Sequence, residues 1–247
     1  MKNISLLRAA IALAMVGVLA GCSGGGSASH SKMGPTSSAS AATYTATDVE
    51  AIIAHVNTEL SLDGTVLDTT EMKAATDTAV GLSALTKSLP SGATIEPAAC
   101  NSLEKLGTSN SQSKLDTTAM LQFGTQWLTV GTVAGRQLPS DLTKGMPAAV
   151  KKLLKDCSSI TMTSGSVSMD MKLSQIDVTT TADNAWGLTM SFGTAGMQST
   201  MTVVTAVSGN LSITAMTADS NIPGASTTNA PTVAPAELID AAIAAAK

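Results

Sequence analysis

The chain has 247 residues and a formal net charge of −4, with 14 Lys and Arg against 18 Asp and Glu. Proteins bind nucleic acid through basic surfaces, so this balance excludes a nucleic-acid partner. Aromatic residues make up 2% of the chain, whereas methionine occurs 13 times. The hydrophobic core must therefore be built from aliphatic side chains and from methionine, a flexible core filler.

The N-terminal residues have the pattern of an export signal. Lys2 and Arg8 carry positive charge, residues 9–20 are apolar, and small residues precede Cys22. The apolar run is shorter than the roughly 20 residues that span a bilayer, and no second such run follows it. We therefore expect residues 1–21 to be a signal peptide that is removed, and we expect no transmembrane helix.

The junction Leu-Ala-Gly-Cys at residues 19–22 resembles the lipobox of bacterial lipoproteins, in which diacylglycerol is joined to the cysteine. The alternative is an ordinary signal peptide with a chance cysteine. Two acyl chains anchor a protein stably, whereas one binds membranes only marginally. The resemblance implies lipidation of Cys22, with palmitate as a typical acyl chain, and attachment to the extracytoplasmic face of the cell membrane, or to the outer membrane in a Gram-negative organism.

Residues 22–46 are dominated by Gly, Ser and Ala. Such a segment buries too little apolar surface to offset its chain entropy, so we expect a flexible tether. His30 lies in this segment and is expected to be solvated. Residues 47–247 are numerous enough for a single extracytoplasmic domain with a substantial core.

Cys100 and Cys157 remain once Cys22 is set aside. A pair of cysteines in an oxidising compartment is typical of a disulfide. Two free thiols or a redox pair are the alternatives, although the spacing is not CxxC. A bridge between these residues would close a loop of nearly 60 residues and contribute about 4 kcal/mol to stability in the chain-entropy model.

Apolar residues at helical spacing predict helices in the first half of the domain, in its centre and at its C-terminus. Residues 47–50, Thr-Asp-Val-Glu, have the form of a capping box for the first helix, and His55 falls outside its apolar stripe. The predicted helices are 47–60, 71–89, a turn around Leu103 and Leu106, 138–157 with an interruption at Pro147, and 236–246 after Pro235.

Alternating apolar and polar residues predict strands, and they are most regular in the second half of the chain. The apolar positions change phase at Ile176 and Val178, which indicates a bulge or bend near Gln175. The predicted strands are 115–123, 126–134, 166–174, 186–192, 201–207 and 211–215, with a hairpin turn at 208–210 and an irregular connection at 218–234. The expected fold is α+β, with an antiparallel sheet of about five or six strands against N-terminal, central and C-terminal helices.

Two cysteine contexts, Ile-Glu-Pro-Ala-Ala-Cys at 95–100 and Leu-Leu-Lys-Asp-Cys at 153–157, resemble a known family. They are similar to actinobacterial extracytoplasmic sensor-type domains, which occur as lipoproteins and as the outer domains of mycobacterial receptor serine/threonine kinases. The resemblance implies disulfides and a ligand cleft between sheet and helices. The chain departs from the kinase version because it has one candidate bridge, few aromatic residues and no kinase domain. A second resemblance, to lipid-carrying mycobacterial lipoproteins with an apolar cavity, rests on general architecture.

The residue inventory favours a non-enzymatic protein without a cofactor. A hydrolytic triad would have to use His30 or His55, and no Gly-x-Ser-x-Gly motif is present. No spacing singles out a catalytic pair among the carboxylates Asp48, Glu50, Asp68 and Glu71, which suit helix ends better. One histidine and a bridged cysteine pair do not form a zinc site.

The methionines have two interpretations. The main one is that they form the core or the wall of a cavity, and the minor alternative is that their thioethers bind copper(I). The methionines in question are Met162, Met169, Met171, Met190, Met197 and Met201.

Flexible thioether side chains can line an apolar cavity, and tryptophan can stand at its mouth. The candidate lining residues are Met169, Met171, Met190, Trp127 and Trp186. The leading hypothesis is a membrane-anchored ligand-binding or sensor-type lipoprotein whose ligand is a small molecule or a lipid. A carrier of lipids or glycolipids in the cell envelope is the alternative, and a purely structural envelope protein is a third.

Overall fold

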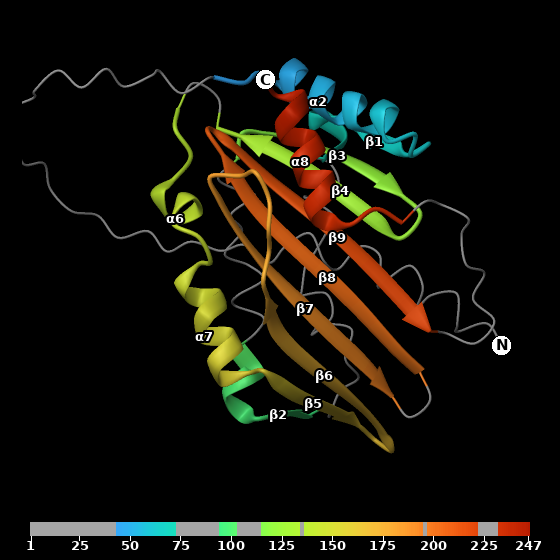
Figure 1. Ribbon diagram of the computed structural model, residues 1–247. Helices are drawn as coiled ribbons and strands as arrows, with labels where there is room; N and C mark the ends of the chain where they lie inside the picture. The colour runs from blue at the N-terminus through green and yellow to red at the C-terminus, as the bar shows by residue number, and fades with distance from the viewer. Residues whose placement is uncertain (1–42, 73–93, 103–114, 134–135, 195–196, 222–231) are drawn as a thin grey trace, which may run out of the picture.

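The computed structural model describes residues 43–72, 94–102, 115–133, 136–194, 197–221 and 232–247 (Figure 1). The expected signal peptide, Cys22 and most of the tether lie outside these residues. So do most of the predicted helix 71–89 and the turn around Leu103 and Leu106.

A nine-stranded antiparallel sheet forms the body of the molecule, with strand order β1-β3-β4-β9-β8-β7-β6-β5-β2 (Figure 1). Strands β6 to β9 form a meander of long neighbouring strands. The strands are β1 (Thr65–Leu67), β2 (Thr94–Glu96), β3 (Thr117–Phe123), β4 (Gln126–Thr132), β5 (Ser159–Ser164), β6 (Val167–Ile176), β7 (Asn184–Thr194), β8 (Met197–Ser208) and β9 (Leu211–Asn221).

The expected α+β class and antiparallel sheet are confirmed, but the expected five or six strands were too few. All six predicted strands are present, and β1, β2 and β5 are additional. Strands β1 and β2 have three residues each and lie at the two edges of the sheet, too short to show a period of two. Strand β9 reaches Asn221, so the first residues of the expected irregular connection at 218–234 are strand.

The helices of the described residues are α2 (Ala46–Glu59), the 3₁₀ helix η1 (Ala98–Ser102), α6 (Ser140–Thr143), α7 (Ala148–Asp156) and α8 (Pro235–Ala245). Helices α2, α6, α7 and α8 lie at predicted positions, whereas η1 precedes the turn expected around Leu103 and Leu106. Pro147 separates α6 from α7 as expected, and Pro235 occupies the first turn of α8.

The capping box of α2 is formed by Thr45 and Asp48, so the predicted box at Thr47 and Glu50 was wrong. The Thr45 backbone N–H donates to the Asp48 carboxylate, and the Asp48 N–H donates to the Thr45 hydroxyl. Hydrogen bonds from Thr45 lower the pKa of Asp48. Glu50 instead accepts a hydrogen bond from the backbone N–H of Thr69, at 3.3 Å.

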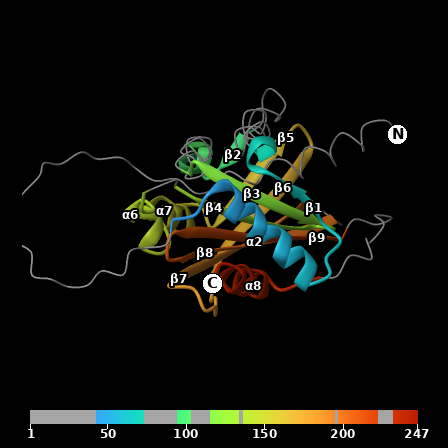
Figure 2. The ribbon, with the colours of Figure 1, turned by 90° about the horizontal axis from the view of Figure 1, so that it is seen from above.

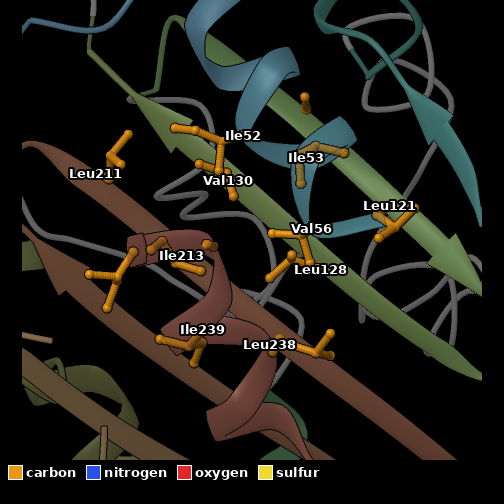
Figure 3. Packing of buried hydrophobic residues seen from close by; sticks show 14 of the residues in the cluster. Ile52, Ile53, Val56, Leu121, Leu128, Val130, Leu211, Ile213, Leu238 and Ile239 are labelled. Atoms are coloured by element: carbon orange, nitrogen blue, oxygen red, sulfur yellow. The ribbon is translucent and has the colours of Figure 1, made fainter. Parts of the chain in front are cut away.

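Helices α2 and α8 lie side by side over one face of the sheet, which we call the helix face (Figures 1 and 2). Their buried side chains meet residues of β3, β4, β8 and β9 in the main hydrophobic core (Figure 3). The register aligns Leu121, Leu128, Ala215 and Val204 in one row across these four strands. Burying such side chains contributes about 1.5–3 kcal/mol each, which fixes both helices on this face.

The phase change in β6 is a change of the face that is buried. Pairing between β6 and β7 is continuous from Asp170 to Ile176, so the predicted bulge near Gln175 is absent. Met171 and Leu173 contribute to the core on the opposite face, whereas Ile176 packs against the helix-face core. The first part of β6 thus contributes side chains to the core on the opposite face and its end contributes to the helix-face core, while its pairing with β7 stays regular.

Gly187 is required where β6 and β7 meet on the helix face. A Cβ at this position would lie 2.6 Å from Ile176 Cγ1 and 2.7 Å from Val178 Cγ2. We predict that Gly187→Ala lowers the free energy of unfolding by about 1–3 kcal/mol through overpacking, as measured by urea denaturation. In an Ile176→Ala background, Gly187→Ala should lower the free energy of unfolding by clearly less. An equal decrease in both backgrounds would contradict the steric explanation.

Candidate functional site

The face of the sheet opposite α2 and α8 carries most of the methionine of the domain, and we call it the methionine face. Directly paired residues in an antiparallel sheet point to the same side, so the register assigns each side chain to a face. Seven methionines from six strands share this face: Met120, Met162, Met169, Met171, Met190, Met201 and Met216.

The register also brings the five candidate lining residues onto the methionine face. Trp127 pairs with Met216, Met216 with Val203, and Val203 with Leu188, so all four side chains point to the same face. Trp186 and Met190 lie two residues before and after Leu188 in β7 and therefore share this face. Met171 pairs with Phe192 of β7, and Met169 is two residues before it in β6. Whether this surface encloses a ligand remains a prediction, but its expected residues share one side of the sheet.

Two hydrophobic clusters divide this face. The first contains Met171, Met190, Met201 and Met216 together with the two cysteines, and the half-buried Trp127 packs against it. The second contains Trp186, which is buried with Leu188 against Met146 and Val150 at α7. The two tryptophans therefore occupy different surroundings, and Trp127 is the one that belongs to the methionine cluster.

The predicted disulfide between Cys100 and Cys157 is present. The two Cα atoms are 5.8 Å apart and the bridge joins residues 57 positions apart in the chain. Cys100 lies in η1, and Cys157 is the C-terminal cap of α7. Both cysteines are buried in the methionine cluster, so the bridge attaches η1 and α7 to the sheet through its β5–β6 side.

The helix face beyond the two helices has a polar surface that the sequence reading did not identify. Thr189 and Thr202 of β7 and β8 pair across the strands, with hydroxyl oxygens 3.5 Å apart, and Ser191 and Thr200 continue the row at 3.4 Å. The same strands thus present methionine to one side and hydroxyl groups to the other. The alternation of residues 186–192 contains this information, but only the register assigns the faces.

The residues considered for acid–base chemistry lie at separate structural positions. His55 is exposed, with Nε2 3.5 Å from a carboxylate oxygen of Glu59 on the same helix. Asp68 accepts hydrogen bonds from the N–H groups of Thr70 and Glu71, while Glu71 accepts one from the N–H of Asp68. These carboxylates therefore cap a helix start, as Asp48 does in α2.

A metal site of the common kind is not found in the part of the chain that the structure describes, because no group of three or more His, Cys, Asp or Glu side chains could hold an ion. In the same residues, no helix is long and apolar enough to cross a membrane.

Comparison with known proteins gives structural neighbours but no family. No family model matches the chain, and no curated protein matches it. An X-ray structure from Mycobacterium smegmatis, described as an uncharacterized protein and Rv0999 ortholog, is 16% identical, with 81% of this chain and 98% of that chain covered and a TM-score of 0.43.

The extracellular domain of the kinase PknH from Mycobacterium tuberculosis is 12% identical to the chain. The match covers 84% of this chain and 97% of that domain, with a TM-score of 0.36. The neighbours thus include the extracellular domain of a mycobacterial kinase, the kind of domain that the sequence resembles. Both TM-scores are below 0.5.

We predict that replacing both bridged cysteines, in Cys100→Ala/Cys157→Ala, lowers the free energy of unfolding by about 4 kcal/mol, because the unfolded chain loses a long cross-linked loop. Urea denaturation measures this loss. Reductant should destabilise the unaltered protein by a similar amount and leave the double variant unchanged. Alkylation of both Cys100 and Cys157 in the unreduced native protein would show that the bridge is absent in solution.

Proposed function

We propose that the chain is an extracytoplasmic lipoprotein, anchored through Cys22, whose folded domain is a non-enzymatic ligand-binding or sensor-type module. The signal-like N-terminus and the lipobox-like junction support export and anchoring. The Cys100–Cys157 bridge supports an oxidising compartment, where structural disulfides persist. The absence of acid–base clusters and metal clusters from the described residues is compatible with binding as the main activity.

The observation that carries the binding proposal is the methionine face. Seven methionines of β3 and of β5 to β9 share one side of the sheet, and Trp127 of β4 lies half-buried on the same side. Methionine adapts its shape through three rotatable bonds and is polarisable, so such a surface accommodates apolar ligands of varied outline. The ligand class that it fits is an apolar or amphipathic molecule with a hydrocarbon portion.

A carrier that moves lipids or glycolipids is the second candidate, and the same methionine cluster favours it. Met190, Met201 and Met216 are each less than 9% exposed, so they lie in the protein interior, where an acyl chain that entered would be shielded from water. Native mass spectrometry of protein purified from its own envelope separates the two proposals. Lipid present in near-stoichiometric amounts favours the carrier, whereas protein without lipid favours the sensor-type module.

We predict that Cys22→Ala abolishes incorporation of labelled fatty acid and releases the chain from the membrane fraction, because the thiol that accepts diacylglycerol is lost. The measurement is palmitate labelling followed by fractionation of cells. The Cys100→Ala/Cys157→Ala variant is the matched control and should remain labelled. Undiminished labelling of Cys22→Ala would disprove the anchor.

We predict that a brominated fatty acid quenches Trp127 more strongly than Trp186, because only Trp127 belongs to the methionine cluster. The protein used is the chain from residue 22 with Cys22→Ser, and the readout is tryptophan emission. Trp127→Phe should remove most of the quenching, and Trp186→Phe should retain it. Equal quenching in the two variants, or none in the unaltered chain, would contradict binding at the methionine cluster.

A further inference from the structure

Helix α7 and the residues before it form a basic patch on an acidic protein. Lys144, Lys151, Lys152 and Lys155 are four of the seven Lys and Arg residues in the described part of the chain. They lie within twelve consecutive positions, although the whole chain has a net charge of −4. Most of the positive charge of the described residues is therefore concentrated at one place.

The lysines of this patch point to solvent, because the apolar side of α7 is turned inward. Val150 and Leu153 are buried against the protein, while all four lysines are exposed. Within the helix only Asp156 opposes them, as the partner of Lys152 in an ion pair. The hydrogen bond from Lys152 also lowers the pKa of Asp156. Lys151 and Lys155, four residues apart, thus share one helix surface, and neither forms an ion pair within the described part of the chain.

The basic patch lies near the end of the domain at which the described chain begins. In both views the described chain begins at the end of the molecule where α6 lies, and α7 continues from α6 along that side (Figures 1 and 2). A Gly/Ser-rich spacer of about 20 residues has a root-mean-square length of about 25 Å. The tether expected at residues 22–46 would join the domain at this end, which would then be the end nearest to the anchor.

The physical effect of the patch depends on its distance from the surface. Lipid headgroups such as phosphatidylglycerol carry negative charge, and each lysine near such a surface strengthens binding about fivefold. The effect decays within a Debye length of about 8 Å at physiological ionic strength. The acidic remainder of the domain is repelled by the same surface, so attraction and repulsion favour one orientation.

We propose that the lysine face of α7 docks on an anionic lipid bilayer and fixes the orientation of the domain on the membrane to which it is anchored. This inference rests on the proposed lipid anchoring for its biological setting, but the docking itself is a property of the folded domain. The other face of the sheet, with its row of hydroxyl groups, and its exposed loops are then presented away from the bilayer.

The test uses the chain from residue 22 with Cys22→Ser, so that no acyl chain contributes to binding. It is sedimented with vesicles of pure phosphatidylcholine or of phosphatidylcholine with 30% phosphatidylglycerol. The chain should bind the anionic vesicles, and 0.5 M salt should reverse this binding through screening. Lys151→Gln/Lys155→Gln should weaken binding on the order of tenfold or more.

The matched control is Lys172→Gln, which is compared with Lys151→Gln because each variant removes one positive charge. Lys172 lies on β6 and, by register with Ser191, faces the helix face, away from the methionine face. This variant should bind nearly as the parent chain does. Equal loss in Lys151→Gln and Lys172→Gln, equal binding to neutral and anionic vesicles, or binding to soluble polyphosphate without binding to vesicles would each overturn the proposal.

Failure of docking and failure of the anchor give different results. If the vesicle result is negative while Cys22 is still labelled with fatty acid in cells, the chain is an anchored lipoprotein without an orienting surface. If docking is observed while Cys22 remains unlabelled, the docking proposal is supported and the proposed anchoring is wrong.

Discussion

The pleat of a single antiparallel sheet determines the arrangement of the whole domain. Side chains of consecutive residues point to opposite faces of the sheet, and the pairing is continuous from β6 to β9. The register that places one set of residues on the helix face therefore also places the alternate set on the methionine face. Val204 and Ala215 meet the two helices, whereas Val203 and Met216, one position away, belong to the methionine face. A shift of register by one residue would exchange aliphatic and thioether surfaces.

The cross-sheet contacts that hold the surrounding segments are made by a few buried amides and the disulfide. The Gln126 side chain donates to the carbonyl of Val233 and accepts from its N–H, which fixes the entry to α8. Asn210, in the turn of the β8–β9 hairpin, accepts from the N–H of Leu138 and donates to the carbonyl of Arg136. Because buried amides are costly without partners, these pairs add to the apolar contacts of Val233 and Leu138 in holding both connections.

The sequence predicts the long elements well because their periodicity is local. Alternation from 166 to 174 and from 186 to 192 identifies β6 and β7, and the cysteine contexts identify the bridge. The face to which each methionine belongs depends on strand pairing, which joins residues as far apart as Trp127 and Met216. The phase change at Ile176 was visible in the sequence, but the explanation requires a second core over the same strand, information that only the three-dimensional arrangement contains.

The scarcity of aromatic residues accounts for the chemical character of the methionine face. A sheet face covered by bulky, rigid rings is shaped by those rings, whereas thioether chains fill space without imposing a shape. Strands β7 and β8 therefore combine an adaptable apolar surface with Thr and Ser on the reverse side, where paired hydroxyl groups meet solvent without need of a covering layer. The disulfide supplies rigidity at the β5–β6 side of this adaptable surface, since it joins η1 and α7 covalently next to Met171. The position of α7 is thus held by the same bridge that lies in the methionine cluster.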